Sequence, residues 1–244
     1  MAVSKKDILL QLQKELLCLH GFALPAAGTV LDLTLGPIAA AFPNSCFPQA
    51  AVHEFISEGP EAAAATSGFV NCLLGGLMKG GKVIVWISGN RMLFPPSLKA
   101  FGVLPDQIIF IDLPRRKDQL WAMEEALKCG GLAAVVAEIQ EIDFTASRRL
   151  QLAVEKSRVT GFLLRQQPRS LQTIAAVARW KILPLASVCY GGMPGLGFPR
   201  WEIELQKIRN GMPGSWQMEW TGESFRLVQP AVSSLPAARM RNTG

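Results

Sequence analysis

The sequence lacks the long apolar runs and paired cysteines that mark membrane-spanning and secreted proteins. No run of about 18 residues is both apolar and free of charge, which argues against a membrane-spanning helix. Residues 1–7 lead into a polar-striped segment, not into the continuous apolar core of a signal peptide. The five cysteines are odd in number and form no C-x-x-C pair, so we expect free thiols in a reducing cytoplasm.

Charge is also scarce. Charged residues are only 18% of the 244 residues, whereas apolar residues make up 49%. This balance argues against a disordered chain and favours one α/β domain with short appendages. The net charge of +6 permits a nucleic-acid partner but is too modest to indicate one.

One segment has the layout of a phosphate-binding loop but lacks the residues that bind phosphate. A working loop reads G-x-x-x-x-G-K-[ST], in which glycines let backbone N–H groups surround the phosphates and lysine neutralises them. Gly59 and Thr66 keep their places. Pro60 and Glu61 occupy the first two variable positions of the motif. Ala64 replaces the second glycine, and Ala65 replaces the lysine. The pattern predicts a nucleotide-binding fold kept as a scaffold, which acts through partners rather than turnover.

The hydrophobic pattern divides the chain into four parts. We expect an amphipathic helix within 1–21, a linker over 22–48, an α/β core over 49–229 and a disordered basic tail over 230–244. A helix beyond a linker must cover its apolar stripe by docking on its own core, on a second copy or on a partner. The stripe consists of Ile8, Leu9, Leu12, Leu16 and Leu19.

Within the core, apolar runs alternate with helical patterns, which predicts right-handed crossovers and a largely parallel sheet. The expected strands of this part are 52–56, 82–88, 107–112, 132–139 and 159–165. The expected helices are 61–78, 96–101, 116–128 and 145–157, the last with Thr145 as N-cap. The final third predicts further strands at 178–183, 201–208, 216–220 and 225–228, which end in an antiparallel hairpin.

The order of these motifs resembles the RecA recombinase family over roughly residues 52–228. The altered loop lies where that family has its Walker A segment, and the strand Gly161–Gln166 resembles one that ends in a sensor glutamine. Within this superfamily the chain most resembles the ImuA family, RecA-like accessory proteins of bacterial inducible-mutagenesis cassettes. The segments that carry this second resemblance are 53–55, 120–127, 145–153, 178–180 and 213–216.

The resemblance implies a role in SOS-induced translesion DNA synthesis in the cytoplasm, with no membrane contact. The implied partners are an inactive Y-family polymerase relative (ImuB) and a DnaE2-type error-prone replicative polymerase, with RecA and DNA as further candidates. By the same resemblance, the water-activating glutamate is replaced by Asn90, and the acid nearest to the magnesium-holding position is Glu138. We therefore expect a degenerate nucleotide site and a non-enzymatic protein without cofactor or metal.

The two long DNA-binding loops of RecA proteins are reduced to short segments, 139–145 and 166–173. A group of arginines lies nearby and predicts a patch that contacts phosphate or an acidic partner surface. The alternative is an ordinary solvated helix face. The arginines are Arg148, Arg149, Arg158, Arg165 and Arg169.

Two further functions stay open at this point. A cell-division inhibitor of the SulA type, which binds FtsZ, shares the pattern of Gly161–Arg165 but lacks much of the region 201–228. A true ATPase with an unusual phosphate loop is the other alternative. Among single residues, His53 is interpreted as a buried, hydrogen-bonded histidine rather than a catalytic base.

Overall fold

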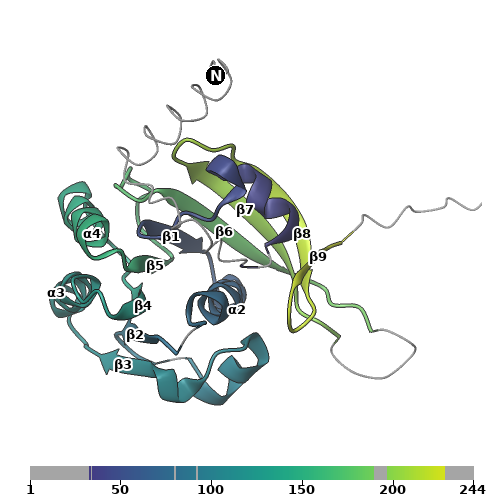
Figure 1. Cartoon of the computed structure of the whole chain (residues 1–244), viewed down its shortest axis with the longest axis horizontal. Coiled ribbons are helices and arrows are strands. Elements are labelled where there is room, and N and C mark those ends of the chain that lie inside the picture. Colours follow the sequence, from purple (N-terminus) through teal and green to yellow (C-terminus); the bar gives the residue numbers. More distant parts are fainter. Residues whose placement is uncertain (1–32, 34, 80, 92, 190–196, 229–244) are drawn as a thin grey trace, which may run out of the picture.

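Short apolar runs of the core pair into one mixed sheet, which a computed structural model describes for residues 33, 35–79, 81–91, 93–189 and 197–228 (Figure 1). Among these residues nine strands follow the order β3-β2-β4-β5-β1-β6-β7-β8-β9. The strands are β1 Val52–Ser57, β2 Val83–Ser88, β3 Ile108–Asp112, β4 Leu132–Glu138, β5 Thr160–Gln166, β6 Ala178–Leu185, β7 Arg200–Ile208, β8 Gly214–Trp220 and β9 Phe225–Leu227. The first six are mutually parallel, and β6 to β9 form an antiparallel meander. The expected sheet is confirmed.

Helices cover both faces of the parallel part, as the crossover connections require (Figure 1). Helix α2 (Pro60–Leu77) packs on one face together with the antiparallel extension, and α3 (Arg116–Leu127) and α4 (Phe144–Ser157) pack on the other. Four 3-10 segments complete the described elements: η1 Gly36–Ala41, η2 Pro43–Ser45, η3 Pro95–Phe101 and η4 Pro105–Gln107. The described residues contain no helix that is long and apolar enough to cross a membrane.

Two local expectations differ from the structure. Helix α4 begins at Phe144, and its N-cap is Asp143 rather than Thr145, because Asp143 Oδ1 accepts the Ala146 N–H at 2.7 Å. The described part of the segment expected as a linker carries η1 and η2, and its Ile38 and Phe42 are buried in the core. The expected N-terminal helix and basic tail lie outside the described residues.

Aromatic residues fill the core between α2 and the sheet. Trp180 stacks on Phe55 with ring centroids 5.9 Å apart, and Phe69 of α2 packs against both Trp180 and Trp201. Helix α2 approaches η3 closely, since a Cβ at Gly75 would lie 2.5 Å from the Phe101 carbonyl oxygen. Trp180 of β6 and Trp201 of β7 are therefore buried between the sheet and α2, so they do not offer stacking platforms to solvent.

A buried carboxylate on β1 forms ion pairs with both neighbouring strands of the sheet, β5 and β6. Glu54 on the central strand β1 binds Arg165 Nη1 of β5 at 2.6 Å and Arg179 Nε of β6 at 2.6 Å. The side chains of Glu54 and Arg165 are each only 1% exposed. Arg165 also donates to the Gln140 and Ser170 carbonyl oxygens, so the ion pair fixes the loops that follow β4 and β5.

His53 is the buried polar residue on the opposite face of β1. Its Nε2 lies 2.7 Å from the Pro48 carbonyl oxygen, and its Nδ1 accepts from Trp180 Nε1 at 3.4 Å. These partners assign the neutral ring with the proton on Nε2. Burial lowers the pKa of His53 to about 4. The interpretation of His53 as a hydrogen-bonded structural residue is confirmed.

Replacing Glu54 is expected to destabilise the fold. Glu54→Gln removes the close counter-charge of two arginines and leaves the fully buried Arg165 with only Glu141 at 3.5 Å, which costs about 3 kcal/mol in free energy of unfolding. Denaturant unfolding measures the loss. The matched control is Glu58→Gln, because Glu58 is an exposed carboxylate that pairs with Lys181, and the expected loss is below about 1 kcal/mol. Equal small losses for both variants would contradict the role given to Glu54.

His53 predicts an acid-sensitive stability. The unfolded chain takes up this proton near pH 6.5, whereas the folded chain does so only near pH 4. Below pH 6.5 the unfolded state therefore binds more protons, and stability falls by about 1.4 kcal/mol per pH unit until about pH 4. Unfolding curves across this window, compared with those of His53→Gln, isolate the effect from carboxylate titration. Equal slopes of unfolding free energy against pH for the two proteins would contradict the role given to His53.

Candidate functional site

Helix α2 begins where a phosphate-binding loop would run. Pro60 is its first residue, Gly59 is the N-cap with φ +85°, and the Ala63 N–H donates to the Gly59 carbonyl oxygen at 3.1 Å. Proline at the first helical position and the following alanines all favour this early start. The helix expected over residues 61–78 is confirmed and begins one residue earlier, at Pro60. Because residues 60–65 are all helical, no loop remains there to surround a phosphate.

The last two loop positions point into the protein. Ala65, at the lysine position, is buried and belongs to the core on the α2 face of the sheet. The Thr66 hydroxyl, which would hold magnesium in a working loop, lies 2.9 Å from the Ser57 hydroxyl in a buried hydrogen bond. Of the other positions, Glu61 and Ala64 are exposed on the first turns of α2.

The carboxyl ends of β2, β4 and β5 open into a separate polar cleft of about 480 Å³. Ligand sites of open α/β sheets lie at this edge, outside the carboxyl ends of the strands. The residues that line the cleft are Gly89, Asn90, Pro114, Arg116, Gln119, Glu138, Gln140, Leu164, Gln166 and Gln167. The structure thus brings together Asn90 and Glu138, whereas Thr66 is not among the lining residues.

Glu138 is the one carboxylate that lines this cleft. Its Oε1 accepts a hydrogen bond from Trp86 Nε1 at 2.8 Å. Burial, with a smaller contribution from the negative charge of Asp112, raises the pKa of Glu138. Asp112 itself is held ionised, since a hydrogen bond from Ser88 and the neighbouring Arg91 lower its pKa. Both strand-end carboxylates therefore have hydrogen-bond partners within the protein.

Amide side chains dominate the rest of the cleft. Gln119 Nε2 donates to the Leu113 carbonyl oxygen at 2.7 Å, and Gln140 Nε2 donates to the Gln167 carbonyl oxygen at 2.9 Å. Amides neither take up nor release protons near neutral pH, so these groups offer hydrogen bonds but no acid–base chemistry. Neither Gln119 nor Gln140 was among the residues expected at the site. The place of Gln140, just after the end of β4, was the signal that could have found it. Gln119 lies inside α3, where no local pattern marks it.

Arg165 does not belong to the expected arginine patch. Its guanidinium is buried between Glu54 and the loops after β4 and β5, and Glu141 lies 3.5 Å away. A buried guanidinium with these partners cannot reach a phosphate at the surface. The expectation for Arg165 is wrong because its partner Glu54, more than 100 positions earlier in the chain, is invisible to local patterns.

The other four arginines stay at the surface. Arg149 of α4 forms an ion pair with Glu124 of α3, and Arg148 is exposed one position earlier on the same helix. Arg158 follows the end of α4 with φ +68°, so it is a cap rather than part of the helix. Arg169 is exposed in the loop after β5. A contact between these four residues and a macromolecule stays a prediction, and so does the stripe Ile8 to Leu19, which lies outside the described residues.

The fold defines the chain as RecA-like. The crystal structure of the RadB recombinase superposes with a TM-score of 0.57 at 12% sequence identity, over 82% of this chain and 100% of that chain. A likeness at this identity shows the fold alone. No protein-family model matches the chain.

Two relatives then identify the family. Protein ImuA of Caulobacter vibrioides, from two strains, is 37% identical over 205 residues, which are 77% of this chain and 84% of the relative. The chain belongs to the ImuA family. Cell division inhibitor SulA of Photorhabdus laumondii is 29% identical over 107 residues, which are 44% of this chain and 60% of that protein.

Magnesium-ATP is expected to leave the melting temperature within about 1 °C of its value without ligand. A protein that binds ATP gains about 2.7 kcal/mol at a hundredfold excess over Kd, or roughly 5–10 °C at this size. The variant Ala64→Gly/Ala65→Lys restores the loop sequence but not the loop, so it is expected to show no shift either. Differential scanning fluorimetry measures both, with an active P-loop ATPase as positive control. A shift of several degrees in the unaltered protein would contradict the loss of the site.

Proposed function

We propose that this protein is a non-enzymatic, RecA-like adaptor in SOS-induced, error-prone translesion DNA synthesis. The observation that carries the proposal is the start of α2 at Pro60, which replaces the phosphate loop by helix in a chain of the ImuA family. A fold that cannot hold a triphosphate at its usual place acts by contact with other macromolecules. Its sheet and two helix layers serve as a rigid support for those contacts.

The argument against turnover rests on three separate losses. The lysine that would stabilise the transferring phosphoryl group is Ala65, and its backbone position is helical. Asn90, which by the resemblance replaces the catalytic base, lines the polar cleft and cannot accept a proton near neutral pH. The Thr66 hydroxyl bonds to Ser57. Each loss alone reduces hydrolysis severely, and together they leave no group to position or activate a water.

The partner in this proposal is the inactive Y-family polymerase-like protein of the same cassette, of the ImuB type. A DnaE2-type polymerase, RecA and DNA are secondary contacts. Support for these partners comes from membership of the ImuA family and from the exposed charged side chains of α3 and α4. The protein works in the cytoplasm, where its DNA-bound partners are.

A second candidate function is inhibition of cell division by binding FtsZ. The 29% identity to the SulA of Photorhabdus laumondii over 44% of this chain favours it. Overproduction in growing cells separates the two functions, because filamentation without DNA damage is expected only of a division inhibitor. Normal cell length at high protein levels supports the adaptor.

Co-purification with the polymerase-like partner tests the leading proposal. The full chain is expected to form a complex that survives size-exclusion chromatography at moderate salt. Deleting residues 1–21 and, separately, 230–244 tests whether the terminal segments contribute to the contact. A full chain that forms no complex with any product of the cassette would overturn the adaptor function.

A further inference from the structure

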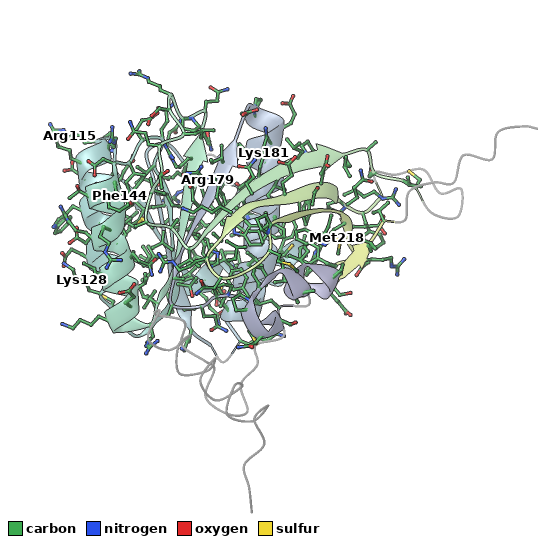
Figure 2. The ribbon with its side chains drawn as sticks, turned by 90° about the horizontal axis from the view of Figure 1, so that it is seen from above. Arg115, Lys128, Phe144, Arg179, Lys181 and Met218 are labelled. Atoms are coloured by element: carbon green, nitrogen blue, oxygen red, sulfur yellow. The ribbon has the colours of Figure 1, made fainter. Side chains whose placement is uncertain are left out.

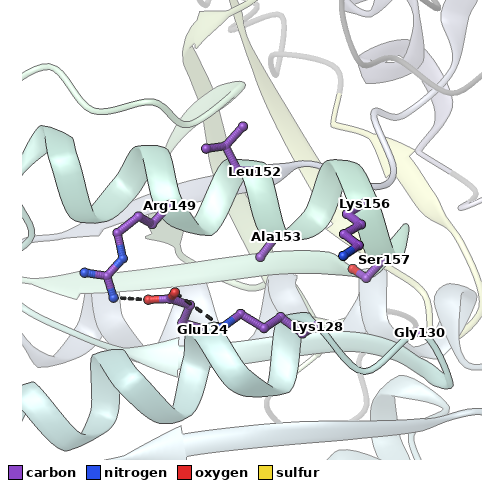
Figure 3. A pocket seen from close by; sticks show the side chains of 8 residues that line it. All are labelled: Glu124, Lys128, Gly130, Arg149, Leu152, Ala153, Lys156 and Ser157. Carbon is purple, nitrogen blue, oxygen red and sulfur yellow. Dashed lines mark hydrogen bonds and ion pairs between the residues drawn. The ribbon is translucent and has the colours of Figure 1, made fainter.

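Helices α3 and α4 enclose a groove on the outer side of the molecule, away from α2. We call it the α3–α4 groove, and it has a volume of about 610 Å³ (Figure 3). Its lining residues are Glu124, Lys128, Gly130, Arg149, Leu152, Ala153, Lys156 and Ser157. The groove shares no residue with the polar cleft at the strand ends.

The groove exists because its floor is made of small residues. Ala153 on α4 and Gly130 after α3 leave space between the helices, where a larger side chain would fill the gap. Leu152 stands on the outward side of α4 and is 50% exposed, which gives the groove an apolar rim (Figure 3). An entering aliphatic or aromatic side chain would cover this leucine and contact Ala153.

Cations outnumber acids around the groove by three to one: Lys128, Arg149 and Lys156 face one carboxylate, Glu124. Glu124 is already neutralised, because it pairs with Arg149 and lies 3.5 Å from Lys128 Nζ (Figure 3). Lys156 has no ion pair or side-chain hydrogen bond within the part of the chain that the structure describes. Lys128 also pairs with Glu125, whose Oε1 lies 2.6 Å from its Nζ. The groove therefore presents a net positive rim, to which Lys156 contributes the excess charge, beside an apolar patch.

An exposed tryptophan adds to this surface. Trp121 is 64% exposed and precedes Glu124 by three residues on α3, so helix geometry places the two side chains on neighbouring parts of one face. Figure 2 shows Arg115, Phe144 and Lys128 along this same side of the molecule. Tryptophan is enriched among the residues that dominate protein–protein binding energy. Trp121, Phe144 and Leu152 are all solvent-exposed on these two adjacent helices, so a partner that covers this side would bury apolar area.

We propose that the α3–α4 groove binds an acidic segment of the partner protein, anchored by an apolar side chain on Leu152 and Ala153. Carboxylates of that segment pair with Lys156 and with the cations beside Glu124. The inference rests on the proposed adaptor function and names the surface that performs it.

The positive charge of the groove favours an acidic segment of a partner over the terminal segments of this chain. The undescribed C-terminal residues 229–244 carry two arginines and no acid, and residues 1–21 carry more lysines than acids. Neither segment complements a positive rim. Nucleic acid matches the charge, but its phosphates gain nothing from the apolar Leu152 and Ala153. An acidic peptide with an apolar anchor satisfies both features of the groove.

The test compares two double variants of the full chain. Leu152→Asp/Lys156→Glu alters the groove, whereas Leu104→Asp/Lys99→Glu makes the same changes at another surface. The control is matched, because Leu104 is 49% exposed against 50% for Leu152, and both lysines are exposed. Affinity for the polymerase-like partner is measured by isothermal titration calorimetry, after circular dichroism has shown that both variants are folded.

The groove variant is expected to lose at least tenfold in affinity and the control less than about twofold. Equal affinities of the groove variant and the unaltered protein would overturn the inference and leave the adaptor function standing. An unaltered protein that does not bind the partner would overturn both.

Overlapping peptides from the partner identify the chemistry of the occupant. Peptides that bind the unaltered protein but not the groove variant are expected to carry a net negative charge around an apolar residue. Basic peptides with that behaviour would overturn the inference. A groove variant that still binds the partner but no longer binds a single-stranded oligonucleotide in fluorescence anisotropy would also overturn the inference. A groove variant in which only self-association changes would do the same.

Discussion

The arrangement of the strand-end edge depends on one buried carboxylate, Glu54. It lies on β1, the strand between β5 and β6 of the parallel part, and it binds one arginine from each of these neighbouring strands. Through Arg165 it also fixes the carbonyl groups of two loops. Buried ion pairs contribute little net stability against apolar replacements, but they demand one geometry. The edge that would be organised by a ligand in a nucleotide-binding protein is thus organised here by the protein's own charges.

The same edge is held together without the residues of a phosphate-binding loop. A phosphate loop holds its shape partly through glycine freedom and partly through the bound phosphate. In this chain the loop positions have become helix, Ala65 has joined the core and Thr66 bonds to Ser57. Each change exchanges a contact with ligand for a contact within the fold. The result is a scaffold whose local structure at this site does not require nucleotide.

Much of the fold follows from local patterns, and the surface features do not. The apolar run expected at 132–139 is Leu132–Glu138, and the helix expected at 116–128 is Arg116–Leu127, because period and propensity act over a few neighbours. The burial of Arg165 depends on Glu54, and the ion pair across the α3–α4 groove joins residues 25 positions apart. Pairings of this kind appear only after the sheet order has placed distant segments side by side. Amphipathic periodicity likewise marks Leu152 as outward but does not reveal the gap beside Ala153.

The two faces of the sheet differ in how much of their helix layer is packed and how much is exposed. The α2 face is closed by the antiparallel extension and by aromatic residues such as Trp180 and Trp201, which leaves α2 largely buried. The other face carries two amphipathic helices, and their outer sides hold Trp121, Leu152 and paired charges. A contact surface on paired helices is held in place by the rigid sheet beneath it and loses little entropy on binding. The proposed recognition surface therefore lies on the helix layer that the antiparallel extension leaves open.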